Sequence, residues 1–158
     1  MGEALFDIET GAEQWYRANL AGPILDKGAF IDAVSACYQP GFTYVDLEGE
    51  IPLTTESKVN EFIQGFSDWL DESPGWNADL VEVQTQALNE FGCLLVAEYR
   101  LTNADGRSVA EGDTVQYFYV LAKKADGFKV ISEGTVSAKT RIQFGSTESA
   151  NAGDNDDG

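Results

Sequence analysis

The sequence predicts an α+β domain: three helices packed on the concave face of a cone-shaped, curved antiparallel (mixed) sheet. Three observations support this prediction. Apolar residues recur at helical spacing only in the first half of the chain, up to Leu70. Through most of the second half they alternate with polar residues, as strands require. The length of 158 residues and the hydrophobic fraction of 43% suit one domain with a sizeable core.

Three helices are predicted before Leu70. The first covers Thr10 to Leu20, because Thr10 and Glu13 have capping-box spacing, and residues 4–9 either extend it or form a separate turn. The second covers Lys27 to Cys37, with Asp26 as a candidate cap. The third runs from Thr55 to Leu70, where one apolar stripe is formed by Val59, Phe62, Ile63, Phe66, Trp69 and Leu70.

Strands are predicted on both sides of the third helix. The stretch GFTYVDLEG, residues 41–49, is mostly a strand, and residues 50–53 form a short second one. Alternation then predicts a four-strand antiparallel meander over residues 78–88, 93–102, 113–123 and 128–144. Helices collected at one end of such a sheet would close a cone, whose interior is a natural pocket. We expect a single domain over residues 1–144 and a disordered acidic tail over residues 145–158.

The charge of the chain limits its partners. The formal net charge is -17, from 27 acidic and 10 basic residues. Such a field repels phosphates and anionic lipids, so we expect neither nucleic acid nor a membrane as partner. The acidic residues either keep the surface soluble or adapt it to a host with high intracellular salt, and we favour the salt-adapted host. No signal-like or bilayer-length apolar run occurs, and we therefore expect a cytoplasmic protein.

Histidine is absent from the sequence. This excludes histidine-dependent triads, histidine general bases and histidine-rich metal sites. Cys37 and Cys93 lie in apolar periodic segments, which favours buried free thiols over a disulfide framework or a zinc site. We therefore expect no cofactor and no metal, and any proton chemistry must rest on carboxylates, tyrosines, lysines or bound water.

The order of the elements resembles the nuclear transport factor 2-like superfamily, the cone fold shared by ketosteroid isomerase and SnoaL-like polyketide cyclases. The resemblance extends over residues 10–144. It rests on PGFTYVDLEG after a helix ending in ACYQP, on the stripe VNEFIQGFSDWL, and on the strand pair QYFYVLAKKADGFKVISEG. Members of this fold often dimerise through the sheet, which implies a homodimer here.

The resemblance also implies roles for single residues. Asp46 matches the general base near the end of the first strand, and Tyr16 matches the hydrogen-bond donor on the first helix. Gln116 stands where the family carries a protonated acid, and an amide cannot supply a proton. Alternation independently puts Asp46 on the face of Phe42 and Tyr44, where an apolar pocket would raise the pKa of the carboxyl group toward that of a general base. Alternatively, Asp46 caps a solvent-exposed turn.

These observations favour a small-molecule-binding SnoaL-like protein. If it is an enzyme, it would be a cofactor-free isomerase, cyclase or dehydratase that abstracts a proton next to a carbonyl of an apolar, oxygen-bearing ligand. The alternative is a non-catalytic ligand-binding or dimerising interaction module of the same fold. The candidate catalytic residues are Asp46 and Tyr16, and the candidate substrate-binding residues are Tyr38, Phe42, Tyr44, Phe62, Phe66, Gln116 and Phe118.

Three charged residues on the predicted strands have two interpretations. Glu98 and Arg100 share one strand face, either as a polar pair inside the cavity or as an ion pair on the outer sheet face. We favour the outer face. Glu133, on the last strand, is a similar case.

Overall fold

The structure is a computed structural model that describes residues 2–21, 27–45, 47–108, 113–137 and 139–144. The residues of the predicted acidic tail, 145–158, and the candidate cap Asp26 lie outside these ranges. The elements are helix α1 (Gly2–Asn19), helix α2 (Lys27–Cys37), strands β1 (Tyr38–Val45) and β2 (Glu50–Leu53), helix α3 (Glu56–Glu72), and strands β3 (Asn77–Asn89), β4 (Gly92–Thr102), β5 (Val115–Lys124) and β6 (Gly127–Thr135).

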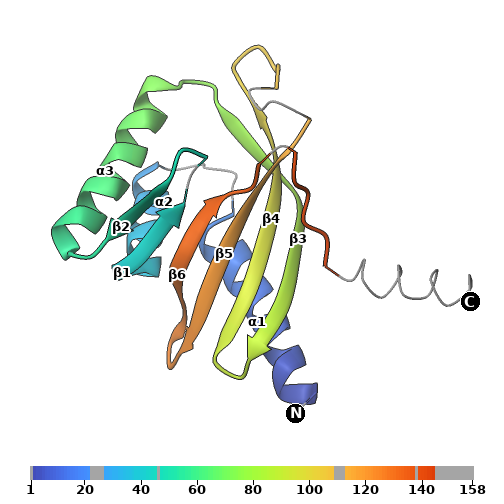
Figure 1. The fold of residues 1–158 in the computed structure, drawn as a ribbon. Helices are drawn as coiled ribbons and strands as arrows, with labels where there is room; N and C mark the ends of the chain where they lie inside the picture. The colour runs from blue at the N-terminus through green and yellow to red at the C-terminus, as the bar shows by residue number, and fades with distance from the viewer. Residues whose placement is uncertain (1, 22–26, 46, 109–112, 138, 145–158) are drawn as a thin grey trace, which may run out of the picture.

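The strands form one curved, unclosed sheet in the order β2-β1-β6-β5-β4-β3 (Figure 1). All neighbours are antiparallel except β1 and β6, which pair in parallel. Helix α1 packs on β3, β4 and β6, α2 packs on β1 and β6, and α3 packs on β1 and β2. The predicted fold class, with three helices on the concave face of a mixed sheet, is confirmed.

Helix α3 forms as its sequence predicts. The Thr55 side chain accepts a hydrogen bond from the backbone N–H of Lys58 and caps the first turn. Val59 and Ile63, on the apolar stripe, are buried on the side of the helix that faces the sheet. The backbone N–H of Ser73 donates to the carbonyl of Leu70 and closes the last turn. This helix forms one wall of the interior of the cone.

Helix α1 is longer than predicted, because it begins at Gly2. Residues 4–9 therefore extend the helix, and Thr10 lies inside it instead of capping it. The physical reason is a continuous buried face: Ile8, Ala12 and Tyr16, spaced by four residues, are each no more than 2% exposed. Because burial of this face stabilises the helix on both sides of Thr10, the helix does not begin at the capping-box signal.

The last strand is shorter than predicted. Strand β6 ends at Thr135, and residues 139–144, called here the C-terminal segment, lie across the outer face of the sheet. The Gln116 side chain donates to the Ile142 carbonyl and accepts from the Ile142 N–H, both at 2.9 Å. Gln84 donates to the same carbonyl at 3.0 Å. Val96, which pairs with Gln84 on this face, is fully buried as a result.

The main core lies between the helices and the concave face of the sheet. Cys37 and Cys93 are buried there as free thiols, as predicted. Burial raises the pKa of each thiol to about 11, so both behave as small apolar side chains. None of the helices in the described ranges is long and apolar enough to cross a membrane.

Candidate functional site

A cavity of about 840 Å³ lies between the concave face of the sheet and the three helices. Helices α2 and α3, Leu20 just after α1, and most strands contribute to its wall, in which aromatic rings predominate. Trp69 and Trp76 lie side by side in this wall, with ring centroids 4.8 Å apart. The other rings in the wall are those of Phe30, Tyr38, Tyr44, Phe62, Phe66, Tyr99, Tyr117 and Tyr119.

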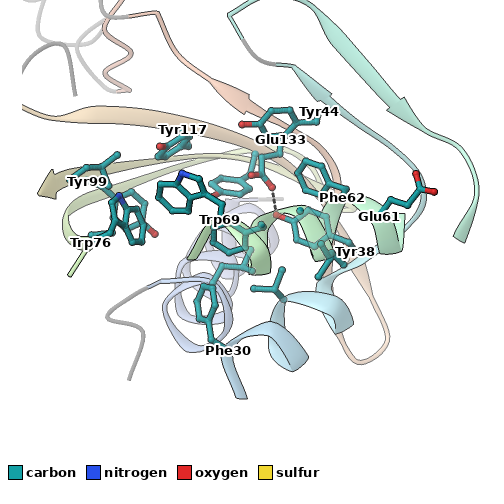
Figure 2. A pocket seen from close by; sticks show the side chains of 18 of the residues that line it. Phe30, Tyr38, Tyr44, Glu61, Phe62, Trp69, Trp76, Tyr99, Tyr117 and Glu133 are labelled. Carbon is teal, nitrogen blue, oxygen red and sulfur yellow. Dashed lines mark hydrogen bonds between the residues drawn. The ribbon is translucent and has the colours of Figure 1, made fainter. Parts of the chain in front are cut away.

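The Glu133 side chain reaches this cavity from β6 (Figure 2). Its carboxylate accepts a hydrogen bond from the hydroxyl of Tyr38, drawn as the dashed line in Figure 2. Glu133 pairs with Tyr44 of β1 on one side and with Tyr119 of β5 on the other. Because directly paired residues share a face of the sheet, these side chains form a row across three strands. The row places one carboxylate among the tyrosines of the wall.

A β-bulge turns Glu133 toward the cavity. The register between β5 and β6 shifts near Ile131, since Val120 pairs with Ser132 whereas Leu121 pairs with Val130. Strict alternation from the buried Val130 would have sent Glu133 to the outer face. The extra residue reverses the alternation, and thus Val130 and Glu133 both face inward.

The environment of Glu133 changes its acidity. Burial raises the pKa of this carboxyl group to about 7, and the hydrogen bond from Tyr38 opposes the rise only in part. Burial also raises the pKa of Tyr38 and Tyr119 well above the usual value. The wall therefore combines hydroxyls that stay protonated with one carboxyl group that exchanges its proton near neutral pH.

Tyr16 forms hydrogen bonds with two tyrosines of the wall from the core side. Its hydroxyl lies 2.5 Å from that of Tyr99 and donates to that of Tyr119 at 3.1 Å. Tyr16 is fully buried in the core and does not line the cavity. The structure thus differs from the prediction that Tyr16 donates directly into the pocket, because its hydroxyl is occupied by Tyr99 and Tyr119.

No protein-family model matches the chain, and a search of curated proteins finds no significant match either. Solved structures do match. A nuclear transport factor 2-like protein with a cystatin-like fold from Novosphingobium aromaticivorans aligns with a TM-score of 0.57 and 12% identity, over 88% of each chain. One of unknown function from Pseudomonas putida aligns with a TM-score of 0.56 and 13% identity, over 92% of this chain and 96% of that chain. A Mycobacterium tuberculosis protein of unknown function aligns with a TM-score of 0.60 and 10% identity, over 85% of this chain and 73% of that chain.

The chain has the nuclear transport factor 2-like fold. The resemblance stated from the sequence is confirmed at the level of the fold. Because the identities are low, the likeness assigns no activity.

Within this nuclear transport factor 2-like fold, four of the predicted substrate-binding residues lie in the cavity wall: Tyr38, Tyr44, Phe62 and Phe66. Phe42 lies behind them, only 1% exposed. Its ring packs against those of Tyr38 and Phe62, with centroids 4.7 and 5.5 Å apart, and supports the wall without forming it.

Gln116 and Phe118 do not line the cavity of this fold, contrary to the prediction. Strand β5 presents Tyr117 and Tyr119 to the cavity, and alternation sends Gln116 and Phe118 to the outer face. There the amide of Gln116 binds the backbone of Ile142. Both faces of β5 are apolar enough to be covered, which is why the sequence pattern could not separate them.

Asp46 lies outside the described residues, so its role as a general base stays a prediction. Glu98 lies on the outer face, as favoured, but its charged partner is Arg141 rather than Arg100. It also accepts a hydrogen bond from Thr114. Burial alone would raise the pKa of Glu98, but the bonds from Arg141 and Thr114 lower it overall. Glu98 therefore anchors the C-terminal segment, whereas Glu133 is the acid inside the nuclear transport factor 2-like cone.

Proposed function

We propose that the protein binds a small, mostly apolar molecule inside the cone, with one polar group of the ligand placed at Glu133. The open cavity of about 840 Å³ carries this proposal, because its size is that of small-molecule sites. Its composition agrees, since an aromatic wall with few polar groups favours an apolar ligand and orients it. The tyrosine hydroxyls and Glu133 are the groups that would fix the orientation.

A blocking variant tests this binding function. Gly65 lines the cavity from α3, and a Cβ added at this position meets no atom within 4 Å. Gly65→Phe would extend a ring at the cavity, whereas Gly65→Ala adds little volume and serves as the matched control. We expect the neutral dye Nile red to bind one molecule per wild-type chain, measured by its own emission. Affinity should fall by about tenfold in Gly65→Phe and stay near wild type in Gly65→Ala.

Equal affinities in both variants would place the dye elsewhere on the surface. Absence of stoichiometric binding to the wild-type chain would reject the cavity as a ligand site.

The contact between Glu133 and Tyr38 supports a second candidate, cofactor-free proton transfer next to a carbonyl. Glu133 would remove the proton from the carbon beside the carbonyl, and a tyrosine hydroxyl would donate a hydrogen bond to the oxygen that becomes negative. Return of the proton to another carbon gives isomerisation, and departure of a hydroxyl group gives dehydration. Asp46 remains the other candidate base.

Deuterium exchange separates these candidates without a known substrate. Benzylacetone in deuterium oxide would exchange its α-protons at a rate followed by NMR. We expect wild type to accelerate the exchange, with the rate rising through about pH 7 as Glu133 ionises. Loss of the acceleration in Glu133→Gln assigns the base to Glu133, and loss in Asp46→Asn assigns it to Asp46. No acceleration by the wild-type chain favours the non-catalytic binding module.

A further inference from the structure

We infer that the ligand of the cavity is an organic cation, an amine on an apolar body, held by the Glu133 carboxylate within a cage of aromatic rings. This inference rests on the proposed binding function and names the chemical class of the ligand. Ammonium groups bind well where a carboxylate and ring faces meet, because both are electron-rich.

Aromatic rings surround the carboxylate from two sides. Tyr38 bonds to it, and Tyr44 is its direct neighbour on β1. The ring of Phe62, from α3, lies 5.1 Å from that of Tyr44 and 6.3 Å from that of Tyr38. Figure 2 shows these rings clustered around Glu133. A cation placed at the carboxylate would therefore lie close to several rings at once, and closeness to several rings is what a cation–π cage requires.

No basic side chain competes for this carboxylate. The chain has 10 lysines and arginines, all of them in the described ranges, and none lines the cavity. The other charged residue in the wall, Glu61 on α3, is also acidic and points away from Glu133 (Figure 2). A buried carboxylate in an apolar wall is usually neutralised by a protein cation or a proton. Here a cationic ligand can supply the positive charge that neutralises the Glu133 carboxylate.

The net charge of the whole molecule also favours a cationic ligand. A net charge of -17 raises the concentration of cations near the surface and lowers that of anions. Among the described residues of the wall, an anionic ligand would meet two acidic side chains and no basic one. Cations and neutral molecules are thus the ligand classes that the cavity admits.

Cationic and neutral ligands demand opposite protonation states of Glu133. A cation needs the carboxylate, whereas a neutral carbonyl gains a hydrogen bond from the protonated acid. The neighbouring hydroxyls do not obscure this difference, because burial raises the pKa of Tyr38, Tyr99, Tyr117 and Tyr119. Among charged side chains on the packed helices, Glu61 is exposed at the edge, and Arg17 of α1 is exposed and pairs with Glu13.

Two probes of equal shape isolate the charge. Benzyltrimethylammonium is a permanent cation, and neopentylbenzene is its neutral isostere, with carbon in place of nitrogen. Benzylacetone represents neutral oxygen-bearing ligands. Calorimetry or the fluorescence of Trp69 and Trp76 would give the affinity of each for wild type, Glu133→Gln and the control Glu72→Gln, which changes an exposed acid of α3 outside the cavity wall.

We expect wild type to bind the cation about tenfold or more tightly than its neutral isostere. The affinity for the cation should rise at least about fivefold from about pH 5.5 to about pH 8.5, since Glu133 ionises in this range. Glu133→Gln should lose most of the preference and the pH dependence. Glu72→Gln should keep both, because Glu72 is exposed outside the cavity wall and its charge is screened at about 0.15 M salt.

A second variant covers the case in which Glu133→Gln does not fold. Phe62→Leu replaces a ring of the cage that is only partly buried, and it should lower the preference for the cation. Equal binding of cation and isostere, or a preference for benzylacetone that declines with rising pH, would overturn the inference while leaving the proposed binding function intact. Failure of all three probes to bind would overturn both.

Discussion

At the scale of the residue, the burial of Glu133 has a consequence for stability. In the unfolded chain a glutamate has a pKa near the usual 4.5, whereas in the folded protein the pKa of Glu133 is about 7. Between these values the folded state binds more protons than the unfolded state. Its contribution to stability is therefore fully present below about 4.5 and is lost as the pH rises through about 7.

Replacing Glu133 by glutamine should remove this pH dependence. Glutamine keeps the size of the side chain and can accept the hydrogen bond from Tyr38, but it carries no charge. We expect Glu133→Gln to be more stable than wild type at about pH 8, with the difference shrinking toward about pH 5. Urea unfolding at a series of pH values measures it, with Glu61→Gln as the control. A difference independent of pH would mean that Glu133 titrates normally in the folded state.

Tyr16 is predicted to stabilise the fold through its hydroxyl. Tyr16→Phe removes the group that bonds to Tyr99 and Tyr119 without changing the packing of the ring. We expect a loss of about 1–2 kcal/mol in the free energy of unfolding, because the two partners lose a buried bond but still border the cavity. Urea unfolding would measure the loss. An unchanged free energy would show that cavity water replaces the lost hydroxyl.

At the scale of the element, helices and strands could be predicted because periodicity is a local property. The apolar stripe of α3 and the alternation of apolar and polar residues in β3, β4 and β5 are each visible within one continuous segment of the sequence. The wall residues Tyr38, Tyr44, Phe62 and Phe66 were found for the same reason, since each lies on the inner face of its own element.

The remaining features depend on partners far away in the chain. Glu133 faces the cavity only because of the bulge at Ile131, and one residue out of register reverses every face that follows. The end of β6 and the outer position of Gln116 depend on the backbone of Ile142, which the amide of Gln116 binds. No local pattern contains these contacts. The sequence therefore predicted the elements and part of the wall, whereas the cavity was only the less favoured of two predicted positions for Glu133.

The parallel pairing of β1 and β6 depends on the absence of a side chain at Gly134. A Cβ at this position would overlap the carbonyl oxygen of Val45 and the ring of Phe118. We expect Gly134→Ala to destabilise the protein by about 1–3 kcal/mol, because backbone must move to accept the methyl group. Thermal or urea unfolding provides the measurement.

The control is Gly65→Ala on α3, where the added methyl group meets no atom within 4 Å. It should stabilise the helix by up to about 1 kcal/mol, since alanine favours helix over glycine. A Gly134→Ala variant as stable as wild type would mean that β1 and β6 lie farther apart than described.

At the scale of the whole molecule, the net charge of -17 predicts a strong response to salt. Repulsion among acidic groups opposes the compact state, and ions screen it. We expect the free energy of unfolding to rise as potassium chloride increases from about 0.05 M to about 1 M, measured by denaturation in urea, which is uncharged. Sodium chloride should act similarly if screening is the cause. A flat or falling response would favour a merely solubilising surface over adaptation to a salt-rich host.

The C-terminal segment limits the part of the sheet through which the predicted homodimer could form. The C-terminal segment lies over β4 between Gln84 and Gln116. A second chain that packs on the outer face would meet this segment or use the other end of the sheet, where Ile131 is 46% exposed. We expect a dimer in sedimentation equilibrium that Ile131→Glu converts to monomers. A monomeric wild type would reject the prediction.

The position of the C-terminal segment also sets an order of events during synthesis. Gln84 and Gln116 lie on strands that are not neighbours, with β4 between them, and both bind Ile142. The ribosome makes residues 139–144 after all six strands, so Val96 stays uncovered on the nascent chain until they emerge. Docking of the segment requires β3, β4 and β5 to be paired already. The segment therefore docks only after these three strands have paired, and a nascent chain halted before residue 139 would offer its bare outer face to chaperones and to other nascent chains.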